Sequence, residues 1–414
     1  MYLYFLSVRI AALFGHRKAR QLVQGQGETV ARLREQGFAG RGRTVWFHAA
    51  SAGEFEQARP LIERLRAEAE GVSIVLTFFS PSGYEMRRGY DKVDGVYYLP
   101  FATRRNAREF LDALNPAVAV FVKYEFWPAY LKELKKRGVP VYSVSSIFRE
   151  RQLFFRPWGR PYLNVLRCFT RLYVQDEGSR SLLERHGVTQ VSVAGDTRFD
   201  RVGDIVARAE RVPQAEEFVR GDIYQVATVA GQTSRIIVAG STWPEDEELL
   251  ARYVEEHEDM KLILVPHEPT GSHMRWLFQL FKGRYVLFSR ATRNNIVQSR
   301  VLVVDTMGLL SRLYRYATVA YVGGGFGVGI HNTIEAAAHG VPVLFGTNYG
   351  NFREAQGLID AGAAMAVKRD YRQFAEAMDA ALAAHEDMGR RAAEYVESEK
   401  GATEKIYNGI FKNR

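Results

Sequence analysis

Cysteine is almost absent from this chain of 414 residues, in which Cys168 is the only one. A single thiol excludes a disulfide within the chain, a zinc site made of thiolates and an iron–sulfur cluster, and it suits a reducing compartment. The glycine-rich stretch at 322–329 fits neither the G-x-G-x-x-G pattern nor a phosphate loop ending in Gly-Lys-Ser/Thr. Binding of NAD and hydrolysis of ATP are therefore disfavoured.

The N-terminus lacks an apolar run of the roughly 20 residues that a membrane-spanning helix needs, because residues 1–14 are mostly apolar but Arg9 interrupts them. Basic residues follow this run, whereas a signal peptide places them before it. The pattern predicts a membrane-associating helix over 1–20 that lies in the interface, flanked by Arg17, Lys18 and Arg20. The alternative is a helix docked on the core.

Acidic residues are scarce in the first half of the chain. Residues 1–200 contain 31 Lys and Arg against 20 Asp and Glu, and the rest contain 25 against 27, so the net charge of +9 comes entirely from the first half. Such a surface attracts anionic lipid, nucleic acid or an acidic substrate. The alternative is a surface whose charge serves only solubility.

Short apolar runs alternate with helical patterns in two series, which predicts an α/β protein with parallel sheets. We expect an acceptor-binding Rossmann-like domain over 21–200, a polar linker over 201–233 and a second Rossmann-like domain over 234–385. Two such domains imply a cleft, and ligands of open α/β sheets bind beyond the carboxyl ends of the strands. The expected strands occupy 44–50, 72–80, 117–123, 139–146 and 171–176, then 234–242, 260–268, 301–306, 319–325 and 341–346.

The stretch VGGGFGVGIHNTIEAAAHGVPVLFG, residues 322–346, is the clearest candidate binding element. Gly323, Gly324 and Gly325 follow a strand, and glycine lets backbone N–H groups approach an anion closely. A helix expected from Asn332 to His339 would point its positive end at the same place, with Asn332 as its cap. Glu335 is placed to accept hydrogen bonds from a ribose, or else it is a capping-box acid. His331 has no partner at metal-ligand spacing.

Two further strand ends in the second half carry polar groups. Ser241 and Thr242, in AGSTW, offer hydroxyls at a helix start, although an ordinary helix cap explains them as well. His267 and Glu268, in VPHEP, are placed to contact the edge of a base, and a structural turn is the alternative.

Three strand ends in the first half complete the set of candidates. Glu54, in FHAASAGEFEQARP, sits near a helix start, where a carboxylate serves equally as a general base or as an ordinary acid favoured by the helix dipole. Glu125 follows a strand in KYEFWP, and Arg198 follows one in GDTRFDR, where its planar fork suits a carboxylate on a ligand.

The motifs HAASAGE, KYEFWP, GDTRFD, AGSTW, VDTMGLL and YVGGGF…GIHNTIEAAAHGVPVLFG occur together and in order. In these motifs the chain resembles the 3-deoxy-D-manno-octulosonic acid (Kdo) transferases of Gram-negative lipopolysaccharide synthesis, over nearly its whole length. The resemblance implies a GT-B fold with a C-terminal helix, here 386–414, that returns to the first domain. It also implies inverting transfer of Kdo from CMP-Kdo to the lipid A precursor, lipid IVA, without a metal or another cofactor.

The resemblance assigns roles to the candidate residues. Glu54 becomes the base that deprotonates the acceptor hydroxyl, and Glu125 the second acid of the acceptor domain. Arg198 is expected to face the Kdo carboxylate. The donor-binding residues are expected to be Ser241, Thr242, Gly323, Gly324, Gly325 and Asn332 for the phosphate, Glu335 for the ribose, and Pro266, His267, Met307, Gly308 and Leu309 for the cytosine.

The chain departs from the commoner family pattern at PHEP, where an Arg-His pair usually follows the proline, so the contacts with the nucleotide are open. The resemblance implies an enzyme of the inner membrane, at its cytoplasmic face, that binds an anionic membrane surface and no nucleic acid. The alternatives are another GT-B glycosyltransferase or an epimerase that uses a nucleotide sugar, and a noncatalytic basic binding module. Strand-end motifs in both domains disfavour the last of these.

Overall fold

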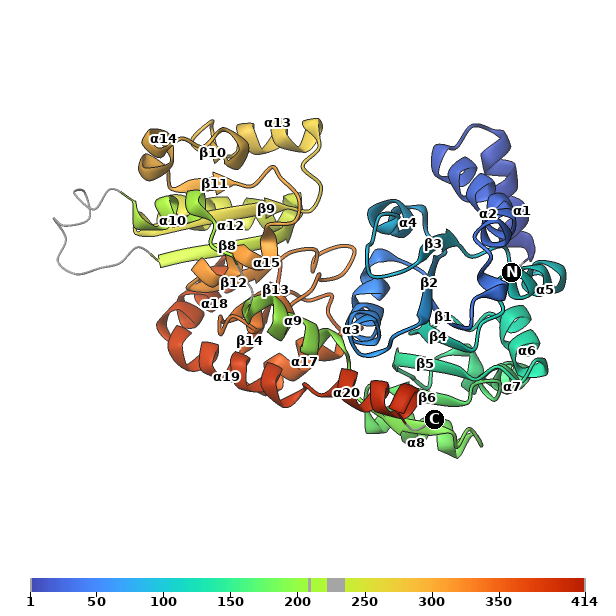
Figure 1. Cartoon of the computed structure of the whole chain (residues 1–414). Helices are drawn as coiled ribbons and strands as arrows, with labels where there is room; N and C mark the ends of the chain where they lie inside the picture. Colours follow the sequence, from blue (N-terminus) through green and yellow to red (C-terminus); the bar gives the residue numbers. More distant parts are fainter. Residues whose placement is uncertain (1, 208–209, 222–234, 413–414) are drawn as a thin grey trace. The chain divides into compact units, whose positions relative to one another are not determined.

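The computed structural model describes residues 2–207, 210–221 and 235–412, and the chain divides into two compact units (Figure 1). The first unit comprises Met1–Arg201 and Glu399–Arg414, and the second comprises Val202–Ser398. The range expected as a linker, 201–233, contains most of α9 (Arg198–Ala207) and all of α10 (Pro213–Arg220). Within the expected C-terminal segment 386–414, the helix α19 (His385–Ser398) belongs to the second unit, and only the residues after it belong to the first.

The first unit is built on a parallel seven-stranded sheet in the order β3-β2-β1-β4-β5-β6-β7. The order reverses between β1 and β4, as in doubly wound nucleotide-binding folds. The strands are β1 (Arg43–Ala49), β2 (Val72–Phe78), β3 (Gly95–Tyr98), β4 (Val118–Val122), β5 (Val141–Ser146), β6 (Arg171–Val174) and β7 (Val191–Val193).

Helices cover both faces of this sheet, which is why the central strands β1 and β4 are buried along almost their whole length. Trp46 and Phe47 are neighbours in β1 and point to opposite faces. Trp46 packs with Phe121 and Tyr130 in one core, and Phe47 packs with Phe55 in the other. The helices are α2 (Arg17–Glu35), α3 (Ala52–Glu68), α4 (Pro81–Arg87), α5 (Arg104–Leu114), α6 (Pro128–Lys136), α7 (Arg160–Leu166) and α8 (Glu177–Arg185), with 3-10 turns η1 (Phe38–Gly40), η2 (Leu153–Phe155) and η3 (Pro157–Gly159).

The C-terminal end of the chain completes the first unit. The helix α20 (Ala402–Tyr407) packs against α3, and the π-helical turn η6 (Asn408–Lys412) follows it. Ile406, Tyr407 and Ile410 are buried in the same core as Phe47. Gly401 and Thr403 donate backbone hydrogen bonds to Asp200 at 2.6 and 2.7 Å, which ties this end to the start of α9.

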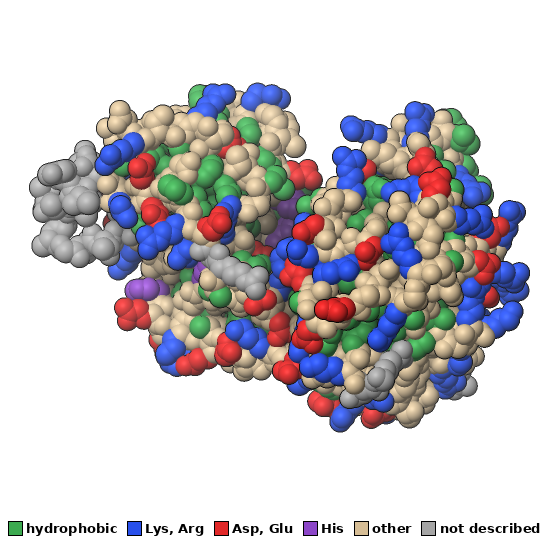
Figure 2. Space-filling view, in the orientation of Figure 1, with side chains coloured by type: hydrophobic (Ala, Val, Ile, Leu, Met, Phe, Trp, Pro, Cys, Tyr) green, Lys and Arg blue, Asp and Glu red, His purple; other side chains and the backbone are tan. Residues whose placement is uncertain are grey.

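The N-terminal helix α1 (Tyr2–Leu13) packs against α2 and against the edge of the first core. Phe5 is buried, with its ring centroid 4.3 Å from that of Phe101. Leu13 and Phe14 leave 83% and 88% of their surface exposed. Among the described residues, no helix has both the length and the hydropathy to cross a bilayer. Figure 2 shows many Lys and Arg side chains on the visible face of the first unit.

The second unit repeats the architecture with a parallel seven-stranded sheet in the order β10-β11-β9-β8-β12-β13-β14. Here the order reverses between β8 and β12. The strands are β8 (Arg235–Thr242), β9 (Met260–Pro266), β10 (Val286–Leu287), β11 (Val301–Val303), β12 (Val319–Val322), β13 (Val343–Gly346) and β14 (Ala364–Val367).

Helices again enclose the sheet, and α10 packs against α14 at its edge. A core around Leu250, Tyr253, Tyr321 and Phe374 lies on one side. The two α/β domains expected from the sequence are therefore confirmed. The remaining elements are α12 (Pro244–Glu256), α13 (Gly271–Leu280), α14 (Arg293–Gln298), α15 (Leu310–Leu313), α16 (Ile334–Ala337), α17 (Arg353–Asp360) and α18 (Tyr371–Ala383), with 3-10 turns η4 (Phe288–Arg290) and η5 (Tyr314–Tyr316).

Candidate active site

In each sheet some of the candidate residues lie where the strand order reverses, the place at which open α/β sheets bind ligands, whereas Arg198 follows the edge strand β7 and His267 follows β9. In the first unit Glu54 follows β1 and Glu125 follows β4, and these two strands are neighbours in the sheet. In the second unit Ser241 ends β8 and the glycines follow β12, which are neighbours as well. The sequence pattern located the strand ends, and the sheet order brings them together in pairs.

Glu54 occupies the first turn of α3, as expected for an acid favoured by the helix dipole, and its role as a general base stays a prediction. Ser51 is the N-cap, and its hydroxyl accepts the N–H of Glu54 at 3.4 Å. The Glu54 carboxylate accepts the N–H of Ala50 at 2.6 Å. Burial raises the pKa of Glu54 above its ordinary value and the charge of Glu125 raises it further, although the Ala50 N–H, His48 and Lys123 lower it in part. A carboxyl with a raised pKa is a stronger base than an ordinary glutamate.

Glu125 is held by two aromatic side chains. The indole N–H of Trp127 donates to Oε2 of Glu125 at 2.6 Å, and Nε2 of His48 lies 3.0 Å from the same oxygen. Nδ1 of His48 lies 3.1 Å from the carbonyl oxygen of Thr77. That oxygen only accepts, so Nδ1 carries a hydrogen. The indole N–H of Trp127 also lies 3.2 Å from Nε2 of His48, so His48, Glu125 and Trp127 form one hydrogen-bonded group.

The backbone at this strand end is strained, because Lys123 adopts a left-handed φ of 51° without being a glycine. Its N–H donates to the carbonyl of Val144 at 2.9 Å, and its carbonyl accepts the hydroxyl of Ser146 at 2.7 Å. These bonds fix the turn that directs Glu125 toward His48. Strain of this kind persists where surrounding contacts over-determine it, and such places are often functional.

Arg198 lies against a buried carboxylate of its own motif. Its Nη2 and Nε donate to Oδ2 of Asp196 at 2.7 and 3.0 Å. Asp196 is 1% exposed and also accepts from Gln57 and Gln175 at 2.9 and 3.1 Å. Burial acts to raise the pKa of Asp196, but the charge and hydrogen bonds of Arg198 outweigh it, so the pKa is lowered. Part of the fork of Arg198 therefore has a structural partner, and contact with a Kdo carboxylate stays a prediction.

The glycine turn after β12 does not present its first two amides to a ligand, which corrects the expected phosphate cradle. The N–H of Gly323 donates to the carbonyl of Gly240 at 2.9 Å, and the N–H of Gly324 donates to Asp246 at 2.9 Å. Asp246 also accepts from the hydroxyl of Tyr321 and the N–H of Trp243, at 2.8 and 2.9 Å. Burial raises the pKa of this carboxyl.

Close packing of backbone explains these glycines. A Cβ on Gly323 would lie 2.5 Å from the carbonyl oxygen of Ser241, and one on Gly325 would lie 2.5 Å from backbone atoms of Gly346. Gly324 has a φ of +90° and its Cβ would meet Gly329. The strand ends of β8, β12 and β13 thus approach more closely than side chains permit.

The hydroxyl of Thr242 also has an internal partner. It is fully buried and donates to Glu247 at 2.7 Å, and the other oxygen of Glu247 lies 2.8 Å from Nε2 of His273. This hydrogen bond with Glu247 raises the pKa of His273. Ser241, in contrast, is partly exposed and has a left-handed φ of 54°. Of the two expected hydroxyls, that of Ser241 is the one open to a ligand.

The helix expected from Asn332 to His339 is a single turn, α16 (Ile334–Ala337), so its dipole is weaker than expected. The side chain of Asn332 accepts the N–H of Ile334 at 3.2 Å and donates to Glu335 at 2.9 Å. The residue at the N-cap position is Thr333, which is buried. Asn332 therefore joins the backbone to Glu335 instead of capping a long helix.

The rings of Trp243, His267 and His331 form an aromatic stack in the second unit. The ring of His267 lies 5.1 Å from that of Trp243 and 4.4 Å from that of His331. Burial lowers the pKa of His331 to about 4, and His267 contributes, so the imidazole is neutral at pH 7. Of the other residues expected to line the cytosine, Pro266 is buried and directly precedes His267 in the sequence. Met307 and Gly308 are exposed.

Several buried polar atoms of the second unit, two of them in this stack, lack a hydrogen-bond partner among the described residues, and a bound ligand is one way to satisfy such atoms. They are Nε1 of Trp243, Oγ1 of Thr306, Nε2 of His331 and Oγ1 of Thr333. None was assigned a role from the sequence, although Trp243 stands in the AGSTW motif. No cluster of three or more His, Cys, Asp or Glu suited to a metal occurs within 2–207, 210–221 and 235–412.

Residues 23–201 match the family model of the 3-deoxy-D-manno-octulosonic-acid transferases (kdotransferases). A 3-deoxy-D-manno-octulosonic acid transferase of Chlamydia trachomatis serovar A is 28% identical over 320 residues, or 74% of this chain and 70% of the relative. The chain is therefore similar to Kdo transferases in its first half by the family model and over most of its length by this relative. A member from Haemophilus influenzae is 24% identical over 379 residues, or 87% of this chain and 85% of the relative.

Solved structures share the fold of this chain more widely. The UDP-GlcNAc 2-epimerase of Neisseria meningitidis has a TM-score of 0.62 at 14% identity and covers 89% of this chain and 100% of its own. MurG of Acinetobacter baumannii has a TM-score of 0.55 at 12% identity, with 90% and 100% covered. At such identities the likeness concerns the fold alone, and it confirms the expected GT-B class.

Proposed function

We propose that this protein transfers Kdo from CMP-Kdo to the lipid A precursor in lipopolysaccharide synthesis. The observation that carries the proposal is Glu54, a carboxyl with a raised pKa at a sheet switch point. It stands within residues 23–201, which match the Kdo transferase family. A glycosyl transfer to a hydroxyl needs a base at the acceptor, and a partly buried carboxylate meets that need.

In the proposed reaction Glu54 accepts the proton of the acceptor hydroxyl. The freed oxygen forms a bond to the anomeric carbon of Kdo as the bond from that carbon to the CMP phosphate oxygen breaks, so the configuration inverts. The negative charge passes to CMP, and Glu54 leaves the step as a carboxylic acid. Glu125 and His48 adjust the charge beside Glu54 without touching the reacting atoms.

The donor is proposed to bind the second unit at the end of β8 and at the turn after β12. Ser241 and the unpartnered atoms of Trp243, His331 and Thr333 are the groups available to a nucleotide. Glu335 is proposed for the ribose, and His267 with Pro266 for the edge of the cytosine. Gly323 and Gly324 shape the site by close approach and do not donate to the phosphate.

The acceptor side is proposed to work at the cytoplasmic face of the inner membrane. The excess of basic residues in the first half of the chain and the exposed Leu13 and Phe14 of the N-terminal region support contact with anionic lipid. We also propose that lipid IVA is the acceptor and that transfer needs no metal.

The test is a transfer assay with freshly generated CMP-Kdo and tetraacylated lipid A precursor in detergent, with the lipid product weighed by mass spectrometry. A mass gain of one or more Kdo units is expected and also counts the additions, and EDTA should leave the rate unchanged. No gain, with CMP still bound, would refute this donor and acceptor pair. Turnover of a UDP-sugar instead would show that the protein is an enzyme of a different nucleotide sugar.

A matched pair of variants separates the base from a change in surface charge. Glu54→Gln should abolish product while CMP-Kdo still binds. Glu85→Gln removes the same charge from the exposed surface of α4 and should leave the rate unchanged. Equal activity of the two variants would contradict the role of Glu54.

A further inference from the structure

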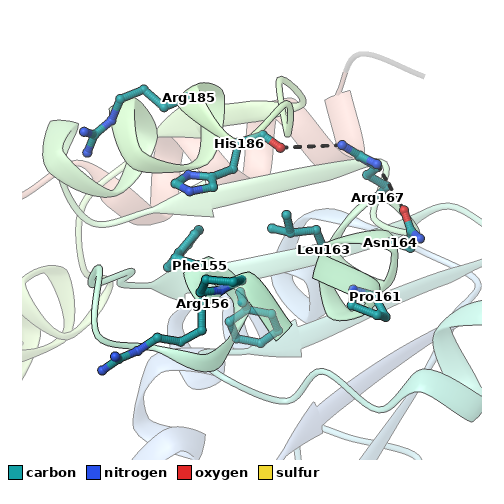
Figure 3. A pocket seen from close by; sticks show the side chains of 10 residues that line it. Phe155, Arg156, Pro161, Leu163, Asn164, Arg167, Arg185 and His186 are labelled. Atoms are coloured by element: carbon teal, nitrogen blue, oxygen red, sulfur yellow. Dashed lines mark hydrogen bonds between the residues drawn. The ribbon is translucent and has the colours of Figure 1, made fainter. Parts of the chain in front are cut away.

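The first unit contains a cavity of about 730 Å³ that lies apart in sequence from the residues assigned to transfer (Figure 3). The turns η2 and η3 and the helix α7 form one side of it, and the C-terminal end of α8 forms the other. Nothing in the proposed transfer uses this cavity, and its lining points to a ligand of particular chemistry.

Three of the ten lining residues are arginines, Arg156, Arg167 and Arg185, and none is a carboxylate. Arg167 is fixed by Asn164, whose side-chain oxygen accepts at 3.0 Å, and by backbone carbonyls. Arg156 donates from Nε to a backbone carbonyl at 3.4 Å. Neutral oxygens leave the charges of these two guanidinium groups uncompensated. The cavity therefore favours an anion.

Arg185 differs, because it also donates to Glu150 at 3.2 Å. Both side chains of this pair are more than half exposed, at 63% and 77%. Solvent screens such a pair and its partners separate readily. Arg185 is thus able to turn to a ligand phosphate at little cost in free energy.

The remaining walls are apolar. Leu163 is buried at the floor, and Phe154 and Phe155 are partly exposed. The ring of Phe155 lies 4.8 Å from that of His186, which closes one side, as Figure 3 shows. A ligand that fills this space presents an apolar part to these rings and an anionic part to the arginines.

The segment that forms the cavity exposes large apolar side chains at its outer surface. Leu153 and Tyr162 are each 44% exposed, and Trp158 is 69% exposed. Tryptophan and tyrosine beside arginine are typical of the boundary between lipid and water. The cavity and these exposed apolar side chains together fit a lipid better than a soluble anion. A soluble anion would leave the apolar side chains in water.

We propose that this cavity binds the phosphate headgroup and the adjoining acyl chain of an anionic phospholipid of the bilayer, with Trp158 and Tyr162 at the membrane surface. The proposal adds a specific lipid site to the general basic charge of the first unit. It does not depend on the transfer chemistry, since none of these residues contacts Glu54 or Glu125 in the interactions described above.

The test measures binding of the full chain to vesicles of phosphatidylcholine alone or mixed with phosphatidylglycerol. The double variant Arg156→Gln/Arg185→Gln should weaken binding to the mixed vesicles roughly 30-fold, since each basic residue near an anionic surface contributes about fivefold. Trp158→Ser should weaken it as well. Binding to phosphatidylcholine alone should not change between the wild type and the double variant.

The matched control is Arg105→Gln/Arg108→Gln, which removes the same charge from the exposed surface of α5. An equal loss of binding in the control would show that only net charge matters and would overturn the proposal. Thermal unfolding confirms that each variant is folded, and inorganic phosphate should not displace the vesicles.

Unchanged vesicle binding, with activity on detergent-dispersed acceptor lost, would assign the cavity to the acceptor instead and would leave the transfer function intact.

Discussion

Nε2 of His48 lies 3.0 Å from Oε2 of Glu125, across 77 residues of sequence. His48 is fully buried, and the indole of Trp127 closes the group from the other side. Burial is the main cause of the raised pKa of Glu54, and to this Glu125 adds while His48 lowers the pKa in part, so the pair modulates how strong a base Glu54 is.

Replacing Glu125 by Gln should move the acid limb of the pH profile of kcat/KM to lower pH. The charge of Glu125 helps to raise the pKa of Glu54, so its removal lowers that pKa. Glu109→Gln, on the surface of α5, serves as the control and should keep the wild-type profile. An acid limb that stays in place in Glu125→Gln would show that the two carboxyls do not interact.

Replacing Glu54 by Gln should stabilise the fold while it removes activity. Burial raises the folded-state pKa of Glu54 above the ordinary 4.5, so the folded chain binds more protons than the unfolded chain between the two pKa values. Stability therefore falls as pH rises through that window. The variant should match the wild type below pH 4.5 and be more stable than the wild type at pH 7. Denaturant unfolding at the two pH values measures this, and a variant less stable at pH 7 would contradict it.

Replacing Arg198 by Gln separates its structural partner from its expected substrate contact. Loss of the cation leaves Asp196 buried and unpaired, which costs about 3–5 kcal/mol. Because Arg198 lowers the folded-state pKa of Asp196, the stability it contributes is present above the unfolded pKa near 3.8 and is lost as pH falls through the folded one. Wild type and variant should therefore converge in acid.

The same variant reports on catalysis through KM for CMP-Kdo. If Arg198 only holds Asp196, the unfolding free energy falls while the KM of the remaining folded enzyme stays the same. A raised KM at unchanged stability would instead support contact with the Kdo carboxylate. Unfolding curves and initial rates on one preparation decide between the two.

Alanine at Gly325 should destabilise the second unit by about 1–3 kcal/mol or more, because its Cβ would lie 2.5 Å from the backbone of Gly346. Gly327 is a close control in the same turn, since a Cβ there meets nothing within 4 Å. Gly327→Ala should keep both the unfolding free energy and the affinity for CMP. Similar unfolding midpoints for the two variants would refute the packing explanation of the glycines.

Hydrophobic runs in the sequence were sufficient to predict most strands of both sheets and to place Glu54, Glu125 and Ser241 at strand ends, whereas β3 and β14 were not predicted. The contact of His48 with Glu125 was beyond prediction, because it depends on the order of strands that are distant in sequence. Likewise, the glycines in the sequence do not show where their backbone N–H groups point. The N–H of Gly324 donates to Asp246, which lies in an acidic helix start.

Hydrogen bonds with residues close in sequence explain the other differences between the predicted and the observed site. Asn332 satisfies the backbone of Ile334 within two residues, and the helix after it ends after one turn. Arg198 stands two residues from Asp196 in GDTRFD, and the pairing was open to prediction from that spacing. Thr242 meets Glu247 five residues later, across a helix start.

The most direct test of the central claim is the single-turnover rate of Kdo transfer in Glu54→Gln, at a CMP-Kdo concentration that saturates the wild type. If Glu54 is the base, the rate should fall roughly 10²–10⁴-fold while the affinity for CMP-Kdo is unchanged. A rate within a few-fold of the wild type would show that another group takes the proton and would contradict the account of the site.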